Sequence, residues 1–175
     1  FRGGCTLEGA TRVAGASTIV NAEASATSEA GAADEFEVLD RLGRLVDNSL
    51  LVLKRVEDGS SRYEMLETVR EFAHQALNEA GEFESVATAH MMYVRDLAAA
   101  AAPKVHLPEA GATKRAIDRE VENVVVAVAN AEKLRNGGVA ALETISALRI
   151  YWVNSGRGEL GMRLVRDALR HAEPL

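Results

Sequence analysis

Apolar residues recur at intervals of three and four along most of the chain, the spacing of one face of an α-helix. The clearest case runs from Glu67 to Ala80, and Gly81 follows it as a helix stop. A shorter helix is predicted to begin at Thr6 and to end near Gly15. The same pattern predicts further helices over residues 34–47, 83–102, 113–135, 139–155 and 159–172.

A single β-hairpin is predicted between these helices. Residues 50–56 are mostly apolar, and the Asp58–Gly59 pair that follows is typical of a tight turn between strands. Residues 62–65 then predict the returning strand, which leads directly into the helix that begins at Glu67. Residues 1–81 therefore resemble in outline a small winged-helix unit, with a hairpin between helices.

The chain as a whole is predicted to be mainly α and to have two parts. The first, residues 1–81, is the winged-helix-like unit, and residues 16–33 within it are predicted to be a loop or an insertion. The second, residues 82–175, is predicted to be an array of antiparallel helices similar to tetratricopeptide (TPR) repeats. Because the chain opens on Phe1 and not on Met, we interpret it as a piece of a longer protein whose helical array is truncated.

The residues that carry chemistry do not predict an enzyme. The four histidines are scattered, Cys5 is the only cysteine, and neither type has the spacing of a metal site. The chain contains no Gly-x₄-Gly-Lys-Ser/Thr phosphate loop. It also has no apolar run of the ~20 residues that a membrane span needs, and no signal peptide. We therefore expect a non-catalytic, cytoplasmic module without a metal, a cofactor or a membrane partner of its own.

Charge is distributed unevenly along the sequence. Residues 1–88 hold 8 Lys/Arg and 16 Asp/Glu, a net −8, whereas residues 89–175 hold 12 and 10, a net +2. Because DNA binding needs cations that face phosphates, this balance argues against direct DNA binding. The second part carries a possible partner-binding face, in which three arginines recur at helical spacing. They are Arg163, Arg166 and Arg170.

Several stretches together resemble a known family. They are residues 39–52 (LDRLGRLVDNSLLV), 62–73 (RYEMLETVREFA) and 80–82 (AGE). They are similar to the region after the nucleotide-binding domain in bacterial STAND-class (NB-ARC-like) P-loop ATPases, many of which are fused to LuxR-type regulators. The first ten residues resemble the start of the winged-helix domain in that family, and residues 151–159 resemble the helical repeats that follow. Residues 156–174 also resemble half of a TPR, with Gly161 where that pattern usually has Ala.

The resemblance implies a mechanism at the junction of strand and helix. In related ATPases a Met-His-Asp motif at this point contacts bound ADP, and here Leu66 replaces the histidine. The residues that the resemblance assigns to a relay of nucleotide state are Met65, Leu66, Glu67, Thr68 and Arg70. ATP or ADP would bind in a domain upstream of Phe1, which would be one partner. An effector or protein on the helical repeats would be the other.

The leading hypothesis is therefore a non-catalytic regulatory module of a STAND-type ATPase or transcriptional regulator. The alternative is a winged-helix DNA-binding module with a helical oligomerisation arm. Its DNA contacts would be Arg41, Arg44, Lys54 and Arg55. A third possibility is a scaffold that binds protein through its repeats and does not depend on a nucleotide.

Overall fold

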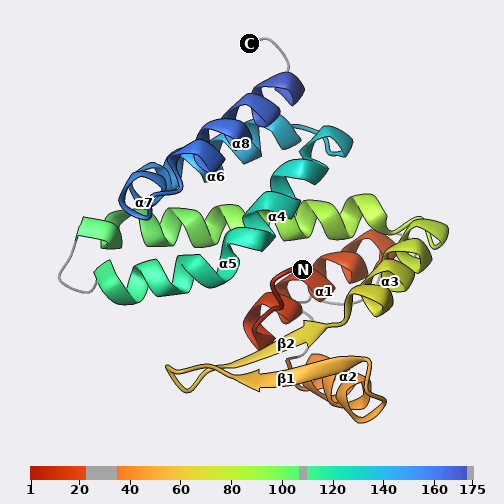
Figure 1. The fold of residues 1–175 in the computed structure, drawn as a ribbon. Helices are drawn as coiled ribbons and strands as arrows, with labels where there is room; N and C mark the ends of the chain where they lie inside the picture. Colours follow the sequence, from red (N-terminus) through yellow and green to blue (C-terminus); the bar gives the residue numbers. More distant parts are fainter. Residues whose placement is uncertain (23–34, 107–109, 173–175) are drawn as a thin grey trace. The chain divides into compact units, whose positions relative to one another are not determined.

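The computed structural model describes residues 1–22, 35–106 and 110–172, with side chains for all of these except 16–22 and 106. The described residues are mainly helical, and their one sheet is a two-stranded antiparallel hairpin, which confirms the predicted fold class (Figure 1). The chain forms two compact units, residues 1–89 and 90–175. The division falls within one helix, and the boundary predicted at Gly81 stays a prediction.

The N-terminal unit is built around the hairpin. Its elements are α1 (Leu7–Ala22), α2 (Glu35–Asp47), β1 (Leu51–Arg55), β2 (Ser61–Met65), α3 (Glu67–Glu79) and the start of α4 (Phe83–Ala101). Strands β1 and β2 pair with Leu53 opposite Tyr63. Buried side chains of α2 and of both strands form one apolar cluster, which fixes α2 against the hairpin. Its members are Val38, Leu42, Leu51 and Tyr63.

Helix α1 is longer than the sequence predicts. The predicted loop at 16–33 begins within it, because α1 continues to Ala22, and residues 23–33 lie outside the described part of the chain. Gly15 was expected to end the helix, but a glycine stops a helix when it takes a positive φ, and Gly15 is not among the residues that do. Gly81, in contrast, has φ +72° and ends the helical segment before α4, as predicted.

The C-terminal unit contains helices and turns but no strand in its described residues. After the second part of α4 come η1 (Ala102–His106), α5 (Ala110–Asn130), η2 (Ala131–Lys133), α6 (Gly137–Ala147), α7 (Arg149–Asn154) and α8 (Gly158–His171). Helices α6 and α8 lie side by side (Figure 1). The largest fully buried apolar side chains of this unit come from α4, α5 and the residue between α6 and α7. They are Met91, Val94, Ile117, Val124, Val128 and Leu148.

The predicted helix over residues 139–155 is divided in two at Leu148. Leu148 has φ −90° and ψ 11°, outside the helical range, and α7 starts after it. The buried indole of Trp152 donates a hydrogen bond of 3.1 Å from Nε1 to the carbonyl oxygen of Ile145, in the last turn of α6. The side chain thus satisfies a carbonyl group near the break, where the regular helix ladder ends.

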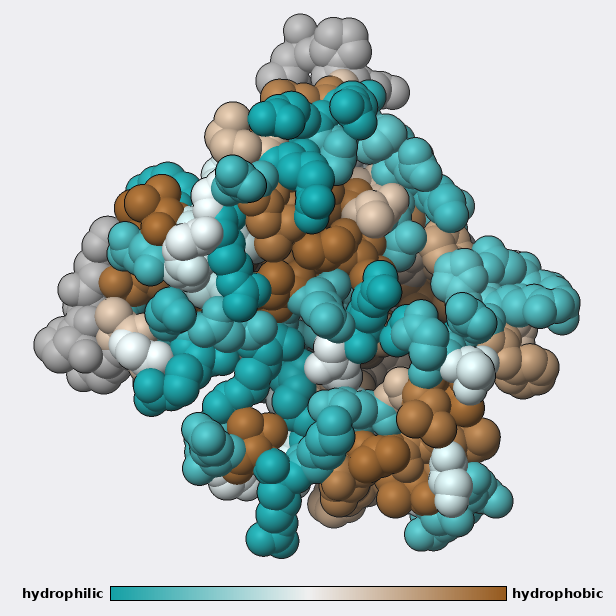
Figure 2. Space-filling view, viewed as in Figure 1, coloured by the Kyte–Doolittle hydropathy of each residue, from teal (hydrophilic) through white to brown (hydrophobic). Residues whose placement is uncertain are grey.

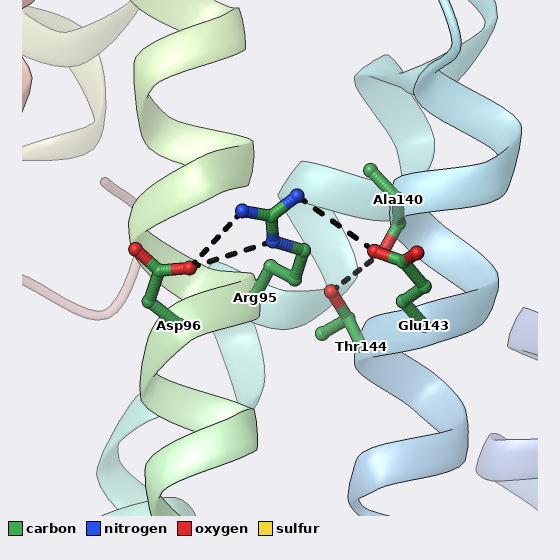
Figure 3. Close-up of polar contacts among 5 residues, drawn as sticks. All are labelled: Arg95, Asp96, Ala140, Glu143 and Thr144. Carbon is green, nitrogen blue, oxygen red and sulfur yellow. Dashed lines mark hydrogen bonds and ion pairs between the residues drawn. The ribbon is translucent and has the colours of Figure 1, made fainter.

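Polar side chains join the helices of the C-terminal unit. Arg95 on α4 lies between the carboxylates of Asp96, at 3.3 Å, and Glu143 on α6, at 3.7 Å (Figure 3). The hydroxyl of Tyr151 on α7 donates a 2.6 Å hydrogen bond to Asp118 on α5. Burial, followed by this hydrogen bond, raises the pKa of Tyr151. These contacts connect α4 to α6 and α5 to α7.

His90, which is buried, and Asp118, which is partly exposed, have shifted protonation equilibria. Burial lowers the pKa of the His90 imidazole to about 3, so this side chain is neutral at pH 7. Burial would raise the pKa of Asp118, but hydrogen bonds from Tyr151 and Lys114 and the charges of Lys114 and Arg157 outweigh it and lower that pKa. Asp118 is therefore an ionised acceptor at neutral pH.

No helix in the part of the chain that the structure describes is both long enough and apolar enough to cross a membrane.

Close contact between α7 and α8 depends on a glycine, which makes a test of this packing possible. A Cβ at Gly161 would lie 2.9 Å from Cγ of Trp152, whereas one at Gly158, on the same helix, would meet nothing within 4 Å. We expect Gly161→Ala to lower the free energy of unfolding by about 1–3 kcal/mol because the indole must shift. Gly158→Ala, the control, should leave it unchanged or raise it by up to ~1 kcal/mol. Urea unfolding followed by circular dichroism measures both, and equal values for the two variants would contradict the packing.

Candidate nucleic-acid interface

The four cations proposed as DNA contacts lie on neighbouring elements of the N-terminal unit. Arg41 and Arg44 are exposed on α2, and Lys54 and Arg55 are exposed at the end of β1. The shared apolar cluster holds α2 and the hairpin together, so the structure positions both groups on one compact unit. Figure 2 shows hydrophobic side chains among the hydrophilic ones over β1 and α2, where Leu39 and Val52 are exposed.

Most of these cations have acidic neighbours. Arg41 pairs with Glu37 at 2.6 Å, and Arg44 pairs with Asp40 at 2.8 Å, each within α2. Lys54 pairs across the hairpin with Glu64 at 2.5 Å. Exposed pairs of this kind contribute only about 0.2–1 kcal/mol each, so exchanging the carboxylate for a phosphate costs little. Arg55 has no ion pair within the described residues.

Arg62 is a cation that sequence reasoning did not single out, and its role is structural. The side chain is buried, and its guanidinium donates hydrogen bonds of 3.0 and 2.9 Å to the carbonyl oxygens of Gly3 and Gly4. The next residue of the first segment, Cys5, exchanges backbone hydrogen bonds of 3.0 and 2.8 Å with Tyr63. Arg62 therefore holds the start of the chain along β2 and does not face a ligand.

The predicted relay residues lie where β2 leads into α3. Met65 ends the strand and packs against the apolar cluster, Leu66 precedes the helix, and Glu67 is its first residue. Arg70 forms an ion pair with Glu67 one turn along the helix. Thr68 is exposed in the first turn. The structure thus brings these five residues together at one junction, and whether they relay a signal stays a prediction.

The three predicted partner-binding arginines are all exposed on α8. Arg170 pairs with Asp167 at 3.0 Å, whereas Arg163 and Arg166 form no ion pair within the described residues. Within the described residues, no group of three histidine, cysteine, aspartate or glutamate side chains could hold a metal ion.

Comparisons with known proteins favour one interpretation of the N-terminal unit, that of a winged-helix module. Residues 4–78 match the family model described as a winged helix-turn-helix domain. These residues form a winged helix-turn-helix domain. The span covers α1, α2 and the hairpin, the elements that carry the four exposed cations, together with nearly all of α3.

Curated relatives extend the similarity beyond this domain. Over 131 residues, 73% of the chain, it is 36% identical to a protein of Mycobacterium bovis and one of Mycobacterium tuberculosis, each named "Putative HTH-type transcriptional regulator". The chain spans about 14% of the length of these relatives. Their names describe transcriptional regulators. No solved structure matches the chain.

The prediction that argued against direct DNA binding is wrong. It is overturned by the winged helix-turn-helix match and by the regulators that the chain resembles, because helix-turn-helix proteins place a helix in a DNA groove. The prediction failed because it summed charge over 88 residues. Five of the 16 acidic residues in that sum lie at or after Glu67, on α3, on α4 or between them, outside α2 and the hairpin.

The different roles of the arginines on the hairpin predict different effects of the same substitution. Arg62→Met removes two charge-assisted hydrogen bonds in a buried site, and we expect it to lower the free energy of unfolding by about 2–3 kcal/mol. Arg55→Met, the control at an exposed position on the other strand, should change it by less than ~0.5 kcal/mol. Chemical denaturation measures both values. A neutral Arg62→Met would show that the guanidinium does not hold the first segment in place.

Proposed function

We propose that the winged helix-turn-helix domain binds duplex DNA as part of a transcriptional regulator. The observation that carries the proposal is the match over residues 4–78, supported by the names of the mycobacterial relatives. The exposed face of α2 and the end of the hairpin are the elements that would contact the duplex, and α3 and the remaining helices would lie outside the contact.

The physical chemistry of this surface favours weak, salt-sensitive binding. The four exposed cations would each meet a phosphate, and three of them must first leave a carboxylate on the same domain. The carboxylates that remain face the same duplex. Binding of DNA as a single copy is therefore expected to be weaker than that of a domain whose recognition helix is basic throughout.

The salt dependence tests this proposal. With four phosphate contacts, the affinity for a 30-bp duplex should fall by roughly 100-fold between 50 and 200 mM salt, a slope of about −3.6. Alanine at Arg55 should reduce the slope by about 1 because one contact is lost. Fluorescence anisotropy with labelled duplex measures both. The control is Lys104→Ala, an exposed cation in the other unit, which should not change the slope. A folded chain that does not bind any duplex at ~50 mM salt would refute the proposal.

A second candidate function is the relay of nucleotide state within a STAND-type, LuxR-like regulator. The observation that favours it is the uncovered apolar surface of the junction. Phe72 on α3 is 72% exposed, Leu66 is 57% exposed, and no residue of α3 is buried. An amphipathic helix with this much apolar surface is suited to pack against another domain. ATP or ADP would bind in that domain, and the Glu67–Arg70 pair would sit at the contact.

The relay is tested in a longer protein that carries this chain together with a nucleotide-binding domain. Glu67→Gln removes the partner of Arg70 at the junction, and we expect the dissociation rate of a fluorescent ADP to change by several-fold, on the order of 1 kcal/mol of coupling. Glu71→Gln, an exposed acid one turn further along α3, is the control and should have no effect. The same dissociation rate in both variants, with the fold intact, would exclude the relay role.

A further inference from the structure

Helix α8 carries an exposed apolar stripe that the C-terminal unit does not use. The unit buries Gly161, Leu164 and Ala168 of this helix. Met162 and Leu169 are 55% and 57% exposed, although both are large and apolar. With the half-buried Val165 between them, they recur at i, i+3 and i+7 and so lie in one row along two turns, about 10 Å long.

A row of cations runs beside this stripe. Arg163, Arg166 and Arg170 have the same spacing, shifted by one residue, which turns their row by about 100° around the helix axis. Arg166 thus lies next to the stripe. Asp167 pairs with Arg170, which leaves Arg163 and Arg166 without an ion pair among the described residues. The surface of α8 therefore combines apolar contact area with positive charge that the described part of the unit does not neutralise.

We propose that this outer face of α8 docks an acidic amphipathic helix of a partner protein. An apolar row at i, i+3 and i+7 matches the row of a second helix packed along it. The flanking arginines select a partner that places Asp or Glu beside its own apolar row, and they repel a basic one. The proposal concerns the second unit and is independent of the DNA-binding function proposed for the first.

Two other occupants fit the surface less well. An anionic membrane also attracts basic amphipathic helices, but it needs the whole apolar face of the helix, and Leu164 and Ala168 are committed to the interior of the unit. A second copy of the chain would place α8 against α8 in a symmetric contact, with the arginine rows of both copies close together. The test includes both as outcomes.

The experiment uses the chain of residues 1–175 and three designed peptides of 21 residues. One has a leucine row flanked by glutamates, the second has lysines in place of the glutamates, and the third has the composition of the first in scrambled order. We expect the first to bind and the others to bind at least about 10-fold more weakly, measured by fluorescence anisotropy. Heteronuclear NMR shifts should place the bound peptide on α8.

Substitutions on α8 separate the two rows. The double variant Met162→Ser and Leu169→Ser should weaken binding of the acidic peptide by about 10-fold or more, because both apolar contacts are lost. Arg166→Glu should weaken the acidic peptide and strengthen the lysine peptide, a reversal that loss of fold cannot produce. Arg149→Glu makes the same change of charge at an exposed position on α7 and should leave both affinities unchanged.

Several results would overturn the proposal. They are equal binding of the acidic and scrambled peptides, no binding of the acidic peptide by the folded chain, and unchanged binding by the double serine variant. Binding to vesicles with 30% phosphatidylserine that the serine variant loses would assign the stripe to a membrane. Sedimentation as a dimer that the serine variant converts to a monomer would assign it to self-association. DNA binding by the first unit can fail or succeed without affecting any of these outcomes.

Discussion

Strand β2 is the element on which the N-terminal unit depends, because it is paired on both edges and used on both faces. One edge pairs with β1, and the other exchanges hydrogen bonds with Cys5 through Tyr63. The side chain of Tyr63 packs in the apolar cluster. The side chain of the adjacent residue, Arg62, lies on the other face of the strand and donates hydrogen bonds to the carbonyl oxygens of Gly3 and Gly4. Two adjacent residues thus fix the start of the chain, the hairpin and α2. Each surface considered on this unit is positioned by that strand.

The C-terminal unit depends in a comparable way on Trp152. Its indole nitrogen satisfies the carbonyl of Ile145 near the break between α6 and α7, and its ring lies where a side chain at Gly161 would have to go. The absence of a Cβ at Gly161 therefore has a local cause, which is the bulk of the neighbouring tryptophan. The small Gly161 on α8 leaves room for the large side chain of Trp152 on α7. The packing that results turns Met162 and Leu169 away from the interior.

Much of the fold could be predicted because its signals are local. The hairpin, the helix from Glu67 and the glycine stop at Gly81 follow from apolar spacing and from residues that favour turns. Two features could not be predicted in this way, namely the continuation of α1 beyond Gly15 and the break at Leu148. Each depends on contacts with distant parts of the sequence, or on a backbone conformation that the residue type alone does not fix. The burial of Arg62 is of the same kind, since its partners lie 58 and 59 residues away. Spacing along the chain carries no information about such contacts.

The candidate site is harder to predict than the fold, because the net charge of a long segment does not measure the charge of one local surface. A sum over residues 1–88 gives an acidic residue on α3 the same weight as one beside Arg44. Screening at physiological salt, however, limits the range over which an exposed charge acts to roughly 8 Å. What a phosphate would meet is set by the few side chains around α2 and the end of β1. There, Arg41 and Arg44 are held in weak pairs that a stronger anion can replace, and Arg55 has no pair to break among the described residues. The same reasoning applies to α8, where the unit's net +2 is uninformative and the juxtaposition of Arg166 with an apolar row is what distinguishes the surface. In both units, the proposed function rests on the local arrangement of charge beside exposed apolar side chains, which only the folded chain defines.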